Sequence, residues 1–191
     1  MNVLHRWLCA SSLWRRIVET RTLPWVLDGV ALGGNVLEIG PGPGITTDLL
    51  RTRVTSLTCV EIDARLVASL QQRTVGKNVT VIQQDATNMS FANDTFDAAL
   101  SFTMLHHVRS AALQDRLLSE VIRVLRPGGI FAGVDSLYSR SFALFHTFDT
   151  LTIVDPAAFP NRLRSVGFVD IDIDVNRNAF RFRARKGAAT L

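Results

Sequence analysis

A glycine-rich turn between an apolar run and a helical segment constrains the fold of this chain more than any other feature. The sequence reads VLEIGPGPGITT at residues 36–47, so that Gly40, Gly42 and Gly44 alternate with prolines. Glycine lets the backbone approach a ligand closely, and a helix N-terminus presents unpaired N–H groups to an anionic group. The pattern therefore predicts a strand, a tight turn and a helix that bind a small ligand.

Apolar runs of strand length alternate with segments of helical period along most of the chain, which is typical of a parallel sheet with crossover helices. We expect strands at 35–39, 56–61, 79–82, 96–101 and 129–134 and helices at 44–53, 63–73 and 110–126. Near the C-terminus, FVDIDIDV and AFRFRARK alternate apolar and charged residues around NRN. This alternation predicts an antiparallel hairpin added to the edge of the sheet.

Length and composition limit the class of protein. A chain of 191 residues fits one domain, and the 47% apolar and 20% charged residues are ordinary for a soluble globular protein. No uncharged apolar run of 18 residues exists, and the N-terminus does not resemble a signal peptide, so we expect an intracellular, cytoplasmic protein. The net charge of +4 is scattered apart from a modest cluster at 181–186, which argues against a nucleic-acid partner.

Cysteine usage indicates neither a metal nor a redox site. Cys9 and Cys59 are far apart and match no ligand spacing, so we interpret both as small buried hydrophobic residues and expect no metal.

The spacing of the glycines separates the ligand classes. A phosphate loop of the Walker type needs a lysine, and this turn has none. A dinucleotide fingerprint needs glycine at the sixth position counted from Gly40, where Ile45 stands, and this disfavours NAD and a nicotinamide-dependent oxidoreductase. The spacing that fits is an acid followed by glycines at alternate positions, namely Glu38, Gly40, Gly42 and Gly44.

This segment resembles the first motif of the Rossmann-like S-adenosylmethionine-dependent methyltransferases. The resemblance continues in order through CVEIDARL, VIQQDATNMSF, FDAALSFTMLHHV and VLRPGGIFAGVD, and covers about residues 35–135. It implies a three-layer α/β Rossmann-like sandwich with a mostly parallel seven-stranded sheet and an antiparallel C-terminal hairpin strand. It also implies S-adenosyl-L-methionine as cofactor and S-adenosyl-L-homocysteine as product.

The second and third strand ends carry the residues expected at the adenosine. Glu61 closes a strand where ligands of doubly wound sheets bind, and its carboxylate can accept both ribose hydroxyls. The resemblance implies that Ile62 packs against the adenine, that Asp85 accepts from the adenine amine and that the Ala86 N–H donates to a ring nitrogen. Asp63 is expected to cap the following helix.

The resemblance assigns two further positions. Glu38 is expected to bond backbone N–H groups of the glycine loop or to reach the amino group of the cofactor through water. Ser101 is expected to offer polar groups to the methionine end.

Candidate catalytic residues lie after the fourth strand. His106 and His107 can act as a general base or can simply orient the loop, and His5, His146 and Tyr138 are more remote candidates. The Asp/Asn-Pro-Pro-Tyr signature of amino-nitrogen methylation is absent at SFTML, which disfavours DNA adenine and protein glutamine acceptors.

The acceptor is indicated only by apolar segments. Residues 1–30 form an N-terminal helical segment that is compatible with plain packing, with a flap over a pocket or with peripheral membrane contact, and residues 31–191 form a single methyltransferase domain. Aromatic residues between 136 and 159 favour a small, apolar or lipid-like methyl acceptor. A protein or RNA acceptor and a non-catalytic adenosylmethionine-binding protein are the alternatives. No pattern indicates an oligomeric state.

Overall fold

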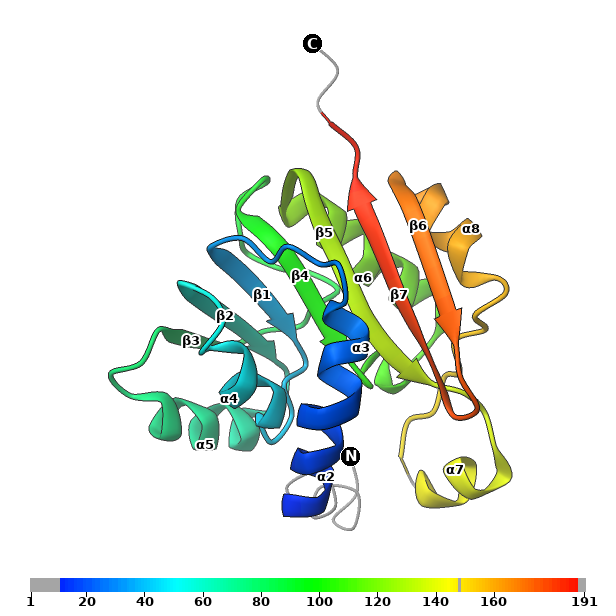
Figure 1. Cartoon of the computed structure of the whole chain (residues 1–191), viewed down its shortest axis with the longest axis horizontal. Helices are drawn as coiled ribbons and strands as arrows, with labels where there is room; N and C mark the ends of the chain where they lie inside the picture. Colours follow the sequence, from blue (N-terminus) through cyan, green and yellow to red (C-terminus); the bar gives the residue numbers. More distant parts are fainter. Residues whose placement is uncertain (1–10, 148, 189–191) are drawn as a thin grey trace.

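The computed structural model describes residues 11–147 and 149–188. Its centre is a seven-stranded sheet in the order β3-β2-β1-β4-β5-β7-β6 (Figure 1). The strands are β1 (Asn35–Ile39), β2 (Ser56–Glu61), β3 (Val79–Gln83), β4 (Phe96–Phe102), β5 (Leu125–Ser136), β6 (Phe168–Val175) and β7 (Ala179–Lys186). The first five are mutually parallel, and β7 is antiparallel to both β5 and β6. The parallel sheet and its antiparallel C-terminal hairpin are thus confirmed.

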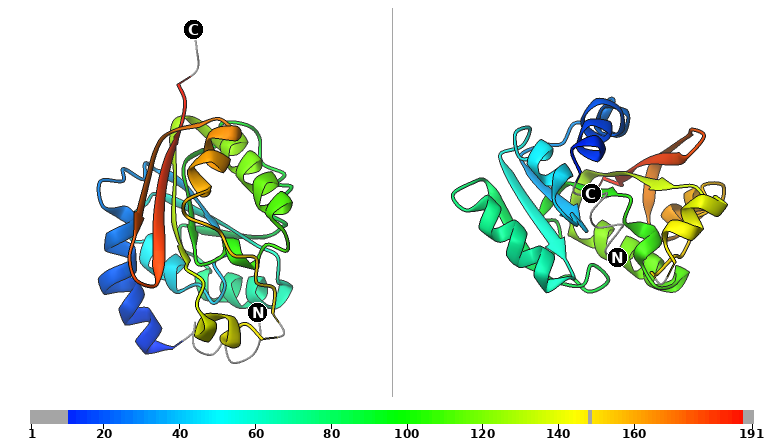
Figure 2. Two further views of the ribbon diagram at one scale, coloured as in Figure 1. Left: turned by 90° about the vertical axis from the view of Figure 1, so that its right-hand side faces the viewer. Right: turned by 90° about the horizontal axis from the view of Figure 1, so that it is seen from below.

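Helices cover both faces of the sheet (Figure 2). They are α2 (Ser12–Ile17), the π-helical η1 (Val18–Thr22), α3 (Leu23–Leu27), α4 (Ile45–Leu50), α5 (Ala64–Thr74), the 3-10 turn η2 (Leu105–His107), α6 (Ala111–Val124), α7 (Arg140–Phe145) and α8 (Phe159–Ser165). Because each face of the sheet is apolar, two separate core clusters form. One joins the sheet to α3, α4 and α5, and the other joins it to α6 and α8. The three-layer sandwich is confirmed.

The boundary between α6 and β5 differs from the sequence prediction. The helix ends at Val124 rather than at 126, because Leu125 already has an extended backbone with ψ of 141° and pairs with Phe96. Proline lacks the N–H that a continuing helix would need, so Pro127 cannot extend α6. The pairing register then shifts between Phe96 and Ala98, which absorbs the Pro-Gly-Gly segment into an irregular start of β5.

The parallel order brings several strand ends to one edge of the sheet. The carboxyl ends of β1, β2 and β4 lie at the lower edge in Figure 1, where α2 and α7 also lie. Ligands of open α/β sheets bind beyond this edge. None of the helices described has the length and hydrophobicity needed to cross a bilayer.

Candidate functional site

The glycine turn connects β1 to α4 through left-handed backbone. Gly40, Gly42 and Gly44 have φ values of 64°, 55° and 80°, and the Gly40 N–H donates to the carbonyl of Val60 on the neighbouring strand at 2.8 Å. A side chain at Gly44 would overlap those of Arg73 and Leu70, whereas one at Gly42 would meet no atom within 4 Å. Gly44 therefore packs directly against neighbouring side chains, whereas the space beside Gly42 is not filled by protein atoms.

Glu61 is fixed beside this turn by backbone donors. Its carboxylate accepts the N–H of Gly42 at 3.1 Å through one oxygen and the N–H groups of Ile62 and Asp63 at 2.9 and 3.0 Å through the other. The residue is only 8% exposed. Asp63 in turn accepts from the N–H groups of Arg65 and Leu66, which confirms it as the N-cap of α5.

A pocket of about 530 Å³ lies between the glycine turn, the strand ends and the N-terminal helices. This volume is in the usual range for small-ligand sites. The pocket is lined by Trp14, Val18, Thr22, Ile39, Gly40, Pro41, Gly42, Pro43, Ile45, Thr46, Val60, Glu61, Ile62, Asp63, Leu66, Gln84, Asp85, Ala86, Thr87, Phe102, Thr103, Met104, His107, Val108, Arg109, Leu113, Leu117, Asp149 and Thr150.

Three of the expected adenosine contacts line this pocket. Ile62 lines the pocket and is 65% exposed. Asp85 follows β3 with its carboxylate accepting from the Thr87 N–H at 2.8 Å, and Ala86 lies between them. An apolar surface and a second carboxylate thus line the same pocket as Glu61.

The partners of Glu38 differ from the expectation. Its carboxylate accepts from the hydroxyls of Thr46 and Thr47, and the Cys59 thiol lies 3.4 Å away, so side chains rather than loop N–H groups hold it. Burial raises the pKa of Glu38, and the two hydroxyl donors only partly oppose that shift. Glu38 is 1% exposed and does not line the pocket, and Cys59 is buried and free as predicted.

Ser101 does not reach the pocket either. It lies inside β4 with 0% exposure, paired with Ile39 and Gly133 on the neighbouring strands. The pocket wall at this point is formed by Phe102, Thr103 and Met104, which follow it in the chain. The strand extends one residue beyond Ser101 before the loop begins, so the contact of the Ser101 side chain with the methionine end stays a prediction.

The two candidate histidines have different surroundings. His106 is 1% exposed, and Asp135 at the end of β5 accepts both its backbone N–H at 3.0 Å and its ring Nδ1 at 2.5 Å. His107 lines the pocket, with its Nδ1 4.0 Å from the Asp149 carboxylate. Of the two, only His107 can contact a pocket ligand.

His146 joins this pair from a distant part of the sequence. Its ring Nδ1 lies 2.8 Å from the Phe142 carbonyl, and its ring centroid lies 5.0 Å from that of His106 and 5.4 Å from that of His107. Burial lowers the pKa of His146, which favours the neutral imidazole. Sequence reasoning named this residue only as remote, since nothing local indicates that α7 returns to the fourth-strand loop.

The remaining sequence candidates lie elsewhere. Tyr138 is 62% exposed and does not line the pocket, and His5 and Cys9 lie outside the described residues. Among the aromatic residues expected near a substrate, Phe159 belongs to the core, where it packs on Phe180 and Phe182, and Phe142 packs on His106. The apolar pocket wall comes instead from Trp14 and from the segment that follows β4.

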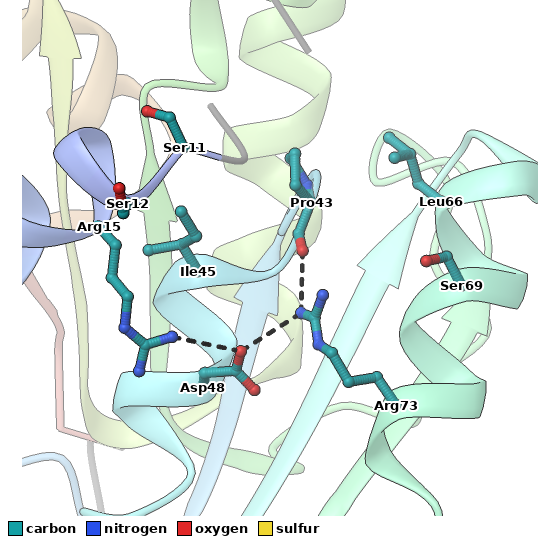
Figure 3. A pocket seen from close by; sticks show the side chains of 9 residues that line it. All are labelled: Ser11, Ser12, Arg15, Pro43, Ile45, Asp48, Leu66, Ser69 and Arg73. Atoms are coloured by element: carbon teal, nitrogen blue, oxygen red, sulfur yellow. Dashed lines mark hydrogen bonds and ion pairs between the residues drawn. The ribbon is translucent and has the colours of Figure 1, made fainter. Parts of the chain in front are cut away.

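A charged group that sequence reasoning missed supports the back of the glycine turn. Figure 3 shows Asp48 on α4 between Arg15 of α2 and Arg73 of α5, at 3.8 and 3.6 Å. Arg73 also donates to the carbonyls of Pro43 and Gly44, at 2.9 and 3.1 Å. The group joins three helices around the turn, and no sequence spacing relates its members.

The three arginines of β7 pair with aspartates within the hairpin, whereas Lys186 pairs with Asp94 before β4. Arg181 and Arg183 of β7 pair with Asp172 of β6 at 2.9 and 3.4 Å, and Arg185 pairs with Asp170 at 3.5 Å. The alternating positive charges of β7 thus lie opposite the alternating negative charges of β6 and form ion pairs with them.

Comparison with known proteins gives one family and one fold. A family model described as a methyltransferase domain matches residues 37–133. The chain is 32% identical over 157 residues to the ribosomal RNA small subunit methyltransferase A of Bordetella pertussis, covering 74% of this chain and 58% of that relative. Matches to the curated relatives span from 26% to 58% of their lengths, so the chain spans less than two thirds of them.

Solved structures share the fold at low sequence identity. The PH0226 protein from Pyrococcus horikoshii OT3 superposes with a TM-score of 0.79 at 17% identity, over 93% of each chain. The N-methyltransferase NodS from Bradyrhizobium japonicum WM9, in complex with S-adenosyl-L-homocysteine, superposes with a TM-score of 0.71 at 19% identity, over 94% of this chain and 91% of that one.

Proposed function

The chain belongs to the Rossmann-like S-adenosylmethionine-dependent methyltransferases, and on that premise we propose that it transfers a methyl group to a small, apolar molecule. The observation that carries the proposal is the Glu61 carboxylate, which three backbone N–H groups hold at the edge of a pocket of about 530 Å³. A fixed carboxylate beside an open glycine turn fits a ligand that has a pair of vicinal hydroxyls.

The residues around Glu61 suit the remaining parts of the cofactor. The Glu61 oxygen that accepts only the Gly42 N–H keeps acceptor capacity for a ribose hydroxyl, the exposed Ile62 can cover an adenine face, and Asp85 can accept from the adenine amine. When bound, S-adenosylmethionine supplies a methyl group made electrophilic by its sulfonium, and it leaves as S-adenosylhomocysteine. The protein then has to align an acceptor and exclude water.

The apolar part of the pocket wall supports an apolar acceptor. Met104, Val108, Leu113 and Leu117 belong to this wall, and so does Trp14 of α2. An apolar molecule would lose little free energy on moving from water to this wall. His107 is the candidate general base on this wall if the acceptor carries a proton, whereas His106 positions the loop through Asp135.

The N-terminal segment closes one side of the proposed site. Trp14, Val18 and Thr22 line the pocket from α2 and η1. We therefore extend the proposal to a flap formed by residues 11–30 of the expected segment 1–30, whose first ten residues lie outside the described part of the chain, on a methyltransferase domain assigned to residues 31–191. The cytoplasmic location and the peripheral membrane contact stay predictions.

An RNA acceptor is the second candidate, favoured by the similarity to the ribosomal RNA methyltransferase of Bordetella pertussis. The charge distribution supports it less well. The basic residues of β7 are paired with aspartates of β6, and such pairing reduces the positive potential that attracts a phosphate backbone. We therefore place the small-molecule acceptor first.

Two measurements in sequence test the proposal. Calorimetry with S-adenosylmethionine, S-adenosylhomocysteine and NADH should show binding of the first two and none of the third. Methyl transfer from a radiolabelled donor should then appear in the lipid-soluble small-molecule fraction of a cell extract rather than in RNA or protein. Label in RNA alone would establish the second candidate, and cofactor binding with no labelled fraction would favour a non-catalytic protein.

Replacing Glu61 tests the cofactor site itself. Glu61→Ala should weaken S-adenosylhomocysteine binding by about 1 to 3 kcal/mol, because the ribose hydroxyls lose a charged acceptor. The matched control is Asp170→Ala on β6, whose carboxylate is 73% exposed and which should leave the affinity unchanged. Thermal unfolding of both variants shows whether the fold survives, and an unaltered affinity in a folded Glu61→Ala protein would refute the assigned role.

A further inference from the structure

Three histidines from two separated segments converge beside the pocket. His106 and His107 belong to η2, and His146 caps the C-terminal end of α7. One ring nitrogen of each lies within 4.8 Å of those of the other two. The cluster is largely withdrawn from solvent, since His106 and His146 are 1% and 3% exposed.

The hydrogen bonds of the cluster resemble those around metal-bound imidazoles. Asp135 holds Nδ1 of His106, and the Phe142 carbonyl lies 2.8 Å from Nδ1 of His146. A carboxylate or carbonyl on one ring nitrogen orients the ring and leaves the other nitrogen as the ligand atom. Nε2 of His106 is buried and has no hydrogen-bond partner among the described residues, which costs free energy unless something binds there.

We propose that His106, His107 and His146 bind a divalent metal ion of the zinc class through their imidazole nitrogens. Three histidines with one open coordination position form a common catalytic zinc set. Two carboxylates balance the charge, since Asp135 contacts His106 and Asp149 lies 4.0 Å from Nδ1 of His107. These groups are assembled from three separate parts of the chain, at 106–107, 135 and 146–149, which explains why no sequence spacing indicates a metal.

Binding requires a modest contraction of the cluster. Tetrahedral zinc–nitrogen bonds of about 2.0–2.1 Å place ligand nitrogens about 3.4 Å apart, less than the 4.8 Å within which these nitrogens now lie. His106 is held by two contacts to Asp135, whereas His146 follows a helix of only six residues. The contraction is therefore a movement of His146 toward η2.

The position of the ion deepens the proposed function and rests on it. His107 and Asp149 line the pocket, so in this arrangement His107 acts as a metal ligand in place of a general base and the open coordination position faces the acceptor. A divalent ion lowers the pKa of a bound hydroxyl, which makes an oxygen acceptor the matching class of substrate. In the transfer, the hydroxyl proton passes to water and an oxygen lone pair forms the bond to the methyl carbon. The carbon–sulfur bond breaks with its electrons going to sulfur.

Metal binding is tested on the whole purified protein. After treatment with a chelator, calorimetric titration with Zn²⁺ should saturate at one ion per chain, and Co²⁺ should give the visible absorption of tetrahedral nitrogen coordination. The same protein as purified should contain the metal by mass spectrometry. Absence of saturable Zn²⁺ and Co²⁺ binding would overturn the proposal.

Variants locate the ion. Asp135→Asn should lower Zn²⁺ affinity by about 10- to 100-fold, because carboxylates behind a ligand histidine contribute that much. His146→Gln removes a ligand and should lower it further, while Ser141→Ala on the exposed side of the same helix should bind Zn²⁺ as the wild type does. His146→Gln carries the test if Asp135→Asn does not fold, and unchanged Co²⁺ absorption in His146→Gln would overturn the assignment.

Calorimetry with S-adenosylhomocysteine on the same samples separates this proposal from the proposed function. Zn²⁺ binding without S-adenosylhomocysteine binding would support the metal site and refute the methyltransferase. S-adenosylhomocysteine binding without Zn²⁺ or Co²⁺ binding would overturn the metal site alone.

Discussion

Glu38 places a carboxylate in the interior of the sheet behind the glycine turn. It is 1% exposed, and within the described part of the chain its hydrogen-bond partners are two threonine hydroxyls and a thiol rather than a cation. Burial raises the pKa of this carboxyl, because desolvation penalises the charged form more than the hydroxyl donors stabilise it. The folded protein therefore binds a proton at Glu38 more tightly than the unfolded chain does.

This difference predicts a dependence of stability on pH. Above the unfolded value of 4.5, the unfolded chain releases the proton while the folded protein retains it, so the free energy of unfolding falls as pH rises toward the folded-state pKa. The loss is about 1.4 kcal/mol for each unit by which the pKa is raised. Glu38→Gln cannot ionise and should lack this decline. Urea unfolding of both proteins between about pH 4.5 and 7.5 measures it, and parallel curves would contradict the assignment.

Gly44 combines a left-handed backbone with close neighbours. Its φ is 80°, and an added Cβ would overlap the side chains of Arg73 and Leu70. Gly76 offers a matched comparison, because its φ is 71° and a Cβ there would meet nothing within 4 Å.

We therefore expect substitutions at the two glycines to lower the free energy of unfolding by different amounts. Gly76→Ala should lower the free energy of unfolding by about 1 to 2 kcal/mol through its backbone alone. Gly44→Ala should lose roughly a further 1 to 3 kcal/mol through crowding, and should also weaken S-adenosylhomocysteine binding. Urea unfolding and calorimetry measure the two effects. Equal losses of stability would show that the side chains of Arg73 and Leu70 move aside with no loss of free energy.

One face of the N-terminal helical segment, from α2 into η1, lines the pocket. Trp14, Val18 and Thr22 follow one another at intervals of four residues, which places them on the same side, and all three line the pocket. Two contacts fix the position of the helix. Arg15 pairs with Asp48, and the Trp25 ring N–H donates to Asp174 of β6 at 2.8 Å. The helical segment from α2 to α3 lies over the middle of the sheet in Figure 1, and its side chains contact α4 beside the glycine turn and the edge strand β6.

Removing the pocket-facing side chain of this helix should loosen the cofactor. Trp14→Ala should weaken S-adenosylhomocysteine binding by about 1 kcal/mol, or roughly fivefold, because a half-buried aromatic wall is lost. Leu13→Ala is the control, since Leu13 is 64% exposed on the same helix and does not line the pocket. Calorimetry on the two variants provides the comparison. If Trp14→Ala and Leu13→Ala weaken S-adenosylhomocysteine binding equally, the substitutions act by destabilising the helix and not by removing a contact with the cofactor.

At the scale of the whole molecule, local patterns predicted most of the architecture. The five parallel strands and the hairpin lie where periodicity placed them, with boundaries that differ by a few residues, most at the start of β5. Asp63 caps its helix and Glu61 ends its strand at the pocket, since both depend on neighbours close in sequence. Periodicity succeeds in such elements because burial on a sheet face or a helix face repeats at a fixed interval.

The candidate site was less predictable wherever it depended on long-range packing. Ser101 fits the motif in sequence but lies buried one residue before the strand ends. His106 and His107 are adjacent in sequence, yet one is enclosed by Asp135, 29 residues away, and the other faces the pocket. Arg73 reaches the glycine turn from α5, 29 residues from Gly44. A side chain's exposure depends on what other elements place over it, which no local spacing records.

The sequence by itself therefore determined the glycine turn, the acids that follow the strands and the alternation of strands and helices, because each is a local pattern with a local cause. Only the tertiary structure decided which side chains face the pocket and which support it. It also brought His146 next to His106 and His107, because β5 and α7 return to the carboxyl edge of the sheet. The cofactor residues follow one another along the motif, whereas the histidine cluster exists only after folding has joined distant segments.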